Sequence, residues 1–184
     1  MAGIVDEATE QMGKTIEATK ENFVGIRTGR ANPSLLNGIM VNYYGAPTPL
    51  KQLATISVPE PRALAVSPFD QSQISAVEKA IRDSDLGVSP ARDGNVIRIT
   101  LPEMTEERRK EYVKLAKDEA EKGKVGLRNI RRKARETVEK QLKDDELTED
   151  DRDNIFKQLD TLTKKNSDLI DQLLDTKQKE ILEV

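Results

Sequence analysis

The sequence predicts an α+β protein: a long three-helix bundle with a small β/α/β domain inserted between its first and second helices. Apolar residues recur at helical spacing through residue 28 and again from residue 105 onward. The segment between them is rich in proline and in alternating strand patterns. None of the three helical stripes can be buried alone, so we expect the helices to pack against one another.

The composition agrees with long amphipathic helices. Charged residues make up 34% of the 184 residues and hydrophobic residues 36%, with 3 Phe, 3 Tyr and no Trp. A narrow apolar stripe beside a wide solvated surface needs few aromatic side chains. We therefore expect a core built mainly from aliphatic residues.

The first helix is predicted over residues 3–28. Its seam is partly polar and consists of Val5, Ala8, Met12, Thr15, Thr19, Asn22 and Ile26, flanked by Ile16 and Phe23. The helix should end at "TGRANPS", because Gly29 permits positive φ and Pro33 disfavours a helical Asn32.

The middle segment, residues 31–104, reads as strands with one helix. Strands are predicted through Ile39–Tyr43 and over 53–58, 62–68 and 95–102, with turns at 45–49 and at Asp93-Gly94. A helix is predicted within 70–85, with Asp70 as its N-cap. The stretch "YYGAPTPL" favours a hairpin tip with one buried ring over a binding platform.

Two long helices follow. The first starts at Thr105 and runs for about 37 residues, or roughly 55 Å. Its stripe is Tyr112, Ala116, Ala120, Gly123, Leu127, Ile130, Ala134 and Val138. The sequence "KDDEL" breaks it, and Thr148 caps the next helix, which has acids in its first turn. That helix has a heptad seam: Ile155, Leu159, Leu162, Asn166, Leu169, Leu173, Thr176 and Glu180, widened by Phe156, Ile170, Leu174 and Ile181.

The predicted domains are therefore 1–30 with 105–184 for the bundle, and 31–104 for the inserted domain. The chain crosses between them twice, and a paired linker behaves as a hinge unless the domain interface is large. The predicted hinge residues are Gly29, Arg30, Ala31, Asn32 and Pro33 in one linker, and Leu101, Pro102 and Glu103 in the other.

Several function classes are excluded by residue type. The chain has no Cys and no His, so it offers no thiolate or imidazole metal site and no histidine-based catalysis. It has no nucleotide-binding glycine motif, and "KDDELTEDDRD" lacks the central glycine of a calcium loop. We expect no enzyme, cofactor or metal. The acidic start and the lack of a long apolar run predict a soluble cytoplasmic protein without membrane contact.

The strongest candidate for function is a basic helix face. Arg128, Arg131, Arg132 and Arg135 have the i, i+3, i+4, i+7 spacing that gathers side chains on one face, and residues 122–135 hold no acid. Lys110, Lys114, Lys117 and Lys124 project within about 40° of Arg128. Charge on a helix is usually only a solvated face. Here arginine without interspersed acids favours phosphate, and RNA weakly over DNA. The alternative is a helical structural adaptor whose basic face is incidental.

The chain also resembles the bacterial ribosome recycling factor family over essentially its whole length. The resemblance is carried by "IRTGRANPSLL", "YYGAPTPLKQLA", "VEKAI", "SDLG", "LPEMTEERR" and "RNIRRKA". It implies an L-shaped, monomeric translation factor without catalytic residues. Such a factor acts after termination, with elongation factor G and GTP, to split the ribosome for new initiation.

The resemblance further implies that the bundle lies on large-subunit ribosomal RNA at the A and P sites. The inserted domain would face the small subunit and elongation factor G. The family's RNA-contacting arginines match Arg27, Arg30, Arg128 and Arg131, with Arg132 nearby. With the rest of the basic face, the predicted RNA-binding set is Arg27, Arg30, Lys117, Lys124, Arg128, Arg131, Arg132 and Arg135.

Overall fold

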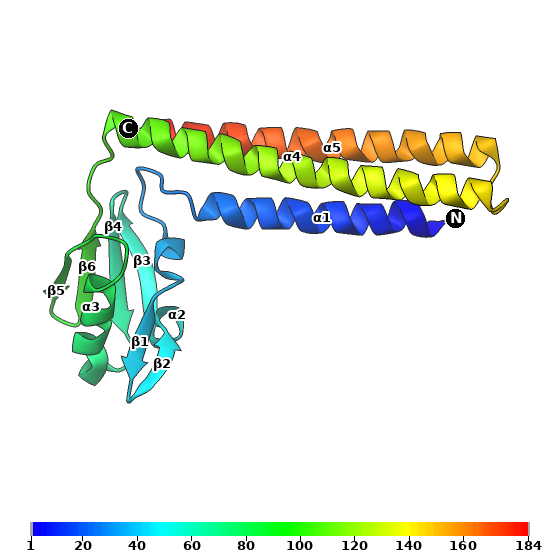
Figure 1. Cartoon of the computed structure of the whole chain (residues 1–184). Coiled ribbons are helices and arrows are strands. Elements are labelled where there is room, and N and C mark those ends of the chain that lie inside the picture. The colour runs from blue at the N-terminus through cyan, green and yellow to red at the C-terminus, as the bar shows by residue number, and fades with distance from the viewer. Residues whose placement is uncertain (1, 184) are drawn as a thin grey trace. The chain divides into compact units, whose positions relative to one another are not determined.

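The computed structural model describes residues 2–183 (Figure 1). They form two compact units. The bundle unit comprises the chain up to Ile26 together with Glu111–Lys179, and the inserted unit comprises Arg27–Lys110 together with the residues from Glu180 onward. The first turn of one long helix and the last few residues of another thus count with the inserted unit.

Three long helices make the bundle unit: α1 (Ala2–Val24), α4 (Glu106–Lys143) and α5 (Glu149–Leu182). Helices α1 and α5 run in the same direction and α4 runs against them (Figure 1). Ala8 of α1, Val138 of α4 and Leu159 of α5 belong to one buried cluster at the end where α4 turns into α5. Farther along, a Cβ added to Gly123 of α4 would meet both Thr19 of α1 and Ile170 of α5. The three stripes are therefore buried against one another.

The first helix is shorter than predicted. It ends at Val24 rather than near residue 28, although Ile26 is still buried. The end is made by local hydrogen bonds: Gly25 N–H donates to the Glu21 carbonyl and Ile26 N–H to the Phe23 carbonyl. The tighter bond at Ile26 closes the last turn before the linker begins.

The turn between α4 and α5 is fixed by two capping motifs. Asp145 adopts φ 57°, and the N–H of Glu146 donates to the Gln141 carbonyl, as in a Schellman helix end. Thr148 then caps α5 as predicted. Its hydroxyl accepts from the Asp151 N–H at 3.1 Å, and its own N–H donates to the Asp151 carboxylate at 3.0 Å.

The seam of α5 departs from the predicted heptads in its second half. Leu169 is 38% exposed, and Thr176 and Glu180 are exposed. The buried positions are instead Ile155, Leu159, Thr163, Asn166, Ile170, Lys177 and Ile181. A straight α-helix has 3.6 residues per turn, so a strict seven-residue repeat drifts round its surface by about 20° per heptad. The buried face follows the helix and not the heptad.

The inserted unit contains a four-stranded antiparallel sheet in the order β3-β4-β6-β5 and a separate hairpin, β1-β2. The strands of the sheet are β3 (Ala54–Glu60), β4 (Ala63–Pro68), β5 (Pro90–Asp93) and β6 (Val96–Thr100). The hairpin pairs β1 (Met40–Tyr43) with β2 (Ala46–Pro49). The helices are η1 (Pro33–Leu36), α2 (Leu50–Leu53), η2 (Gln71–Gln73) and α3 (Ile74–Arg82).

Three local predictions in this unit were wrong or incomplete. The turn predicted over 45–49 is only Tyr44-Gly45, because Ala46–Pro49 pairs as a strand. Both turn residues have positive φ, at 49° and 85°, as a two-residue hairpin of the I′ type needs. The strand Pro90–Asp93 was not predicted, since it begins with proline and has an exposed pattern. Asp70 caps the short η2 turn through the Ser72 N–H and does not cap α3 itself.

The core of the inserted unit is one aliphatic cluster. Its members come from η1, β1, α2, α3 and the four-stranded sheet, and include Leu36, Val41, Leu50, Leu64, Ile81 and Ile97. The predicted fold class is confirmed: an α+β protein with three long helices and an α/β unit inserted between the first and second of them.

Candidate nucleic-acid interface

The predicted basic face lies on α4 within the bundle unit. The side chains of Arg128 and Arg132 are 56% and 61% exposed, and those of Arg131 and Arg135 are 39% and 37% exposed. All four line one surface hollow, together with Glu136, Glu139, Lys140, Lys143 and Phe156. The structure therefore brings the four arginines together at the surface.

The arginines are not without acids, as their sequence neighbourhood suggested. Arg128 pairs with Glu121 at 2.5 Å and Arg132 pairs with Glu136 at 2.9 Å, both within α4. Asp160 of α5 approaches Arg131 at 3.3 Å and Arg135 at 3.7 Å. In the sequence, the end of α4, a turn and the first turns of α5 separate Asp160 from these arginines, and packing of α5 against α4 brings them together.

An aromatic ring holds one of the four guanidinium groups. The Arg135 guanidinium carbon lies 4.1 Å from the centroid of the Phe156 ring of α5. Phe156 is itself half-buried and packs against the cluster that contains Ile155 and Leu159. This cation–π contact restricts where the Arg135 guanidinium can lie.

The two predicted lysines differ in their surroundings. Lys124 is 25% exposed and pairs closely with Asp171 of α5. Lys117 is exposed. A lysine at the surface reaches phosphate as a flexible point charge, whereas arginine can offer two parallel donors. The four arginines are thus the geometrically defined part of the face.

Arg27 and Arg30 belong to the inserted unit. Arg27 is half-buried, and Arg30 is exposed and pairs with Glu183 at 2.8 Å. Both follow the end of α1, on the linker that leads into η1. Both were predicted as members of the RNA-binding set, and both lie in the inserted unit just before η1.

Both linkers are anchored at one turn of the inserted unit. The N–H of Ala31 donates to the Pro61 carbonyl at 2.6 Å, and the N–H of Leu101 donates to the Arg62 carbonyl at 2.8 Å. Glu103 adds an ion pair with Arg62 at 2.8 Å. Among the predicted hinge residues, Asn32 and Pro33 are also held in place by local structure, since Asn32 caps η1 and Pro33 is its first residue. Gly29, Arg30 and Pro102 remain outside these hydrogen bonds.

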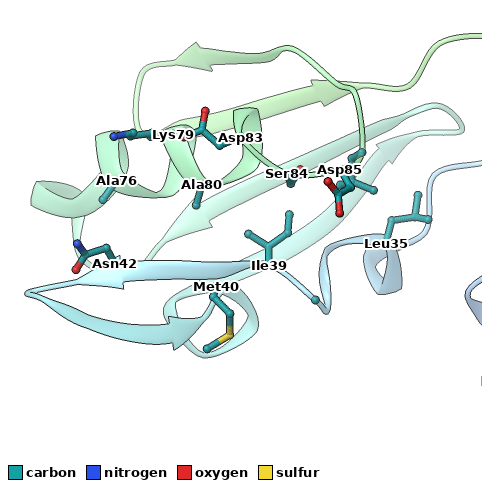
Figure 2. A pocket seen from close by; sticks show the side chains of 12 residues that line it. Leu35, Ile39, Met40, Asn42, Ala76, Lys79, Ala80, Asp83, Ser84 and Asp85 are labelled. Carbon is teal, nitrogen blue, oxygen red and sulfur yellow. The ribbon is translucent and has the colours of Figure 1, made fainter.

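The inserted unit has a pocket of its own, between η1, β1 and α3. Figure 2 shows Ile39 pointing into the space between β1 and α3, while Met40 points away from it. Its polar groups include Asn42, Lys79, Asp83, Ser84 and Asp85. Lys79 shares this rim with two carboxylates, Asp83 and Asp85, so the charged groups of the rim are of mixed sign with acids in excess.

The hairpin tip presents an aromatic ring as well. Tyr44 is 69% exposed and its hydroxyl donates to Asp70 at 2.8 Å, while Tyr43 packs edge-on against it and is half-buried. Hydrogen bonds from Ser72 and Tyr44 hold the pKa of the Asp70 carboxyl below its usual value. The predicted hairpin tip is found, but the predicted buried ring is not, because Tyr43 is only half-buried and Tyr44 is exposed.

Within residues 2–183 there is no group of three or more acidic side chains arranged to hold a metal ion. Over the same range no helix is long and apolar enough to cross a membrane.

Comparison with known proteins decides the family. The model of the ribosome recycling factor family matches residues 19–182. The chain belongs to this family. The ribosome-recycling factor of Bifidobacterium adolescentis is 68% identical over the full length of both chains, and that of Cutibacterium acnes is 52% identical over the full length of both.

Solved structures of recycling factors have the same fold. A solution structure of the ribosome recycling factor is 42% identical, covers 98% of this chain and 96% of its own, and superposes with a TM-score of 0.79. Another comprises models for the T. thermophilus ribosome recycling factor and the E. coli elongation factor G bound to the E. coli post-termination complex. Its matching chain is 43% identical, covers 97% of each chain and has a TM-score of 0.67.

Two residues of α5 that lie beside the arginines of α4 were not predicted as part of the candidate interface. Phe156 was assigned only to the seam of its helix, and Asp160 was not singled out. They stand four residues apart on α5, so they share one side of that helix. A ring and a carboxylate at that spacing, opposite a row of arginines, are the signal that could have identified them.

Proposed function

We propose that this protein, with elongation factor G and GTP, dissociates the post-termination ribosome into subunits and so recycles it for initiation. The family match over residues 19–182 carries this proposal. It is supported by the similar structure in which a recycling factor and elongation factor G are bound to the post-termination complex. Such a protein works in the cytoplasm as a monomer and performs no covalent chemistry itself.

The basic face is the proposed docking surface for large-subunit ribosomal RNA at the A and P sites. The four arginines gathered at one hollow of α4 support this role, because guanidinium groups bind phosphate with two donors at once. Lys117 and Lys124 extend the face along the helix, and Arg27 and Arg30 contribute from the linker. A rigid helical surface reads the shape of an RNA backbone and not its base edges.

The inserted unit is proposed to meet the small subunit and elongation factor G. Its connections to the bundle would act as the hinge, at Gly29, Arg30 and Pro102. The hydrogen bonds of Ala31 and Leu101 to the turn at Pro61 and Arg62 support this narrower set, since they tie those two residues to the sheet, whereas Gly29, Arg30 and Pro102 make no such bond to that turn.

Subunit splitting, followed by light scattering, tests the proposal. Post-termination ribosomes mixed with this protein, elongation factor G and GTP should lose scattering intensity as subunits separate. The same mixture without GTP, or with a non-hydrolysable analogue, should not. If the scattering stays unchanged under all three conditions, the protein does not split ribosomes and the proposed function is wrong.

A further inference from the structure

Asp160 stands out on the proposed docking surface because it is an acid where phosphate should bind. Its Oδ1 lies 3.3 Å from one guanidinium nitrogen of Arg131 and 3.7 Å from one of Arg135. Tight charge-assisted contacts are about 2.7–2.9 Å long. A single carboxylate therefore lies between two arginines without a close bond to either.

A second carboxylate repeats this arrangement. Asp171 lies about three helical turns beyond Asp160 on α5, hence on nearly the same side of that helix. It pairs with Lys124, which belongs to the same basic row of α4. Helix α5 thus contributes two carboxylates that pair with the basic face. Glu121 and Glu136 of α4 itself pair with it as well.

We propose that Asp160 is a specificity-determining residue: a resident counter-ion that occupies the position of an RNA phosphate between Arg131 and Arg135 and must be displaced on docking. This inference rests on the proposed function of the basic face. Its consequence is that the face binds weakly to phosphates met one at a time, and well only to a surface that presents several in fixed positions.

The geometry favours easy displacement. Asp160 is 51% exposed, and exposed ion pairs are weak because water and salt screen them. Arg135 need not move when the carboxylate leaves, since its guanidinium stays over the Phe156 ring, 4.1 Å from the centroid. Arg131 is tied to Asp160 by an ion pair of 3.3 Å, and its guanidinium would turn toward the incoming phosphate once the carboxylate leaves.

The benefit is discrimination and not affinity. Specificity is a difference between two affinities, and a repulsive group lowers binding to the wrong partner. Flexible RNA would have to displace each carboxylate in a separate, poorly coupled step. A folded ribosomal surface supplies its phosphates together, so the cost of displacement is met by many simultaneous contacts.

The test compares Asp160→Asn with Asp168→Asn. Both remove one negative charge from α5, but Asp168 pairs with Lys164 of its own helix at 2.9 Å. Binding to a fluorescent uridine 20-mer and to purified large ribosomal subunits is measured at several salt concentrations. Asp160→Asn should bind the 20-mer about threefold tighter than Asp168→Asn does, as expected for loss of one exposed competing charge.

Two further readouts separate competition from structure. The plot of log affinity against log salt for the 20-mer should steepen by up to about one unit in Asp160→Asn, because one more effective positive charge meets the RNA. The gain on large subunits should be smaller than on the 20-mer, so the preference for ribosomes falls.

Equal binding of the 20-mer by the two variants would overturn the inference. Weaker binding by Asp160→Asn would overturn it too, because the carboxylate would then be positioning the arginines and not competing with phosphate. Failure of the wild-type protein to bind large subunits would refute the proposed function instead, and the 20-mer comparison would still decide the role of Asp160.

Discussion

At the scale of single residues, the basic face shows how a sequence pattern and its spatial surroundings differ. The i, i+3, i+4, i+7 spacing predicted the gathering of Arg128, Arg131, Arg132 and Arg135 correctly, because that spacing is a property of one helix. It could not predict Asp160 or Phe156 beside them, because these come from another helix through tertiary packing.

Arg131 is the arginine whose loss should reveal docking most cleanly. Arg131→Ala should weaken large-subunit binding by about 1–3 kcal/mol, the range for a lost charge-assisted contact. Helical content should hardly change, since the side chain is 39% exposed and leaves no cavity. Equilibrium binding and circular dichroism measure the two effects.

Arg82→Ala is the matched control for that experiment. Arg82 is exposed on α3 and pairs with Glu78 at 2.5 Å, so its removal deletes the same side chain from the inserted unit. If both variants bind large subunits equally well, Arg131 is not a docking residue. A much lower melting temperature for Arg131→Ala, with unchanged binding per folded molecule, would make it structural.

The cap of α5 predicts a pH effect. Hydrogen bonds from the Thr148 hydroxyl and then its N–H hold the pKa of the Asp151 carboxyl below the ordinary aspartate value of 3.8. Because the pKa of Asp151 is lower in the folded protein than in the unfolded chain, the cap contributes its full stabilisation of the fold at pH values above the unfolded-state pKa. This contribution is lost as pH falls through the lower folded pKa.

Asp151→Ala should therefore melt at a lower temperature than the wild type near neutral pH, and the gap should narrow in acid. Asp150→Ala is the control, since Asp150 lies in the same first turn but Thr148 bonds to Asp151. A gap between wild type and Asp151→Ala that stays constant from about pH 7 to about pH 2.5 would rule out the charged cap.

At the scale of elements, prediction succeeded where one helix or strand carries its own signal. The three long helices, the Thr148 cap and the strands β3, β4 and β6 follow from periodicity and turn residues. The two missed strands have a common cause. The strand β5 and the paired segment Ala46–Pro49 are short and proline-containing, and they become strands only because a neighbour pairs with them.

The crossing of the three long helices depends on a missing side chain. A Cβ on Gly123 would lie 2.7 Å from the Thr19 hydroxyl and 3.0 Å from Ile170 Cδ1. Thr19 cannot easily yield, since it is buried and its hydroxyl donates to the Thr15 carbonyl at 2.8 Å. Gly123 is thus a place where α1 and α5 approach α4 closely.

Gly123→Ala should destabilise the protein by about 1–3 kcal/mol through overpacking, despite the better helix propensity of alanine. Gly13→Ala makes the same change in α1 where nothing lies within 4 Å, so it should stabilise by about 1 kcal/mol. Urea denaturation gives both values. Two variants that are equally stabilised would mean that the helices can move apart at Gly123 without loss.

At the scale of the whole molecule, the bundle unit carries the basic face, and the inserted unit holds the anchors of both linkers. The protein has a net charge of −3, yet four of its arginines gather on one face of α4. The two linkers reach the inserted unit at one turn, through Ala31 to Pro61 and Leu101 to Arg62. Because the two anchors are adjacent, we expect rotation of the inserted unit to take place in the linker residues next to them, Gly29, Arg30 and Pro102.

The hinge hypothesis states that motion between the two units is required for splitting ribosomes and not for docking on them. The chain contains no cysteine, so one cysteine can be placed in each unit and pairs screened for rapid oxidation to a disulfide. The crosslinked protein should bind large subunits with nearly normal affinity, because the basic face of α4 is untouched. It should fail to split ribosomes with elongation factor G and GTP, because a locked unit cannot be moved.

Reduction should restore splitting, and each single-cysteine variant should behave as the wild type throughout. These controls separate the effect of the lock from damage by the substitutions themselves. If the oxidised, crosslinked protein splits ribosomes at the normal rate, Gly29, Arg30 and Pro102 form only a linker. Force from the partner would then pass through a rigid molecule to the RNA contact, and Arg131→Ala would be the variant expected to uncouple it.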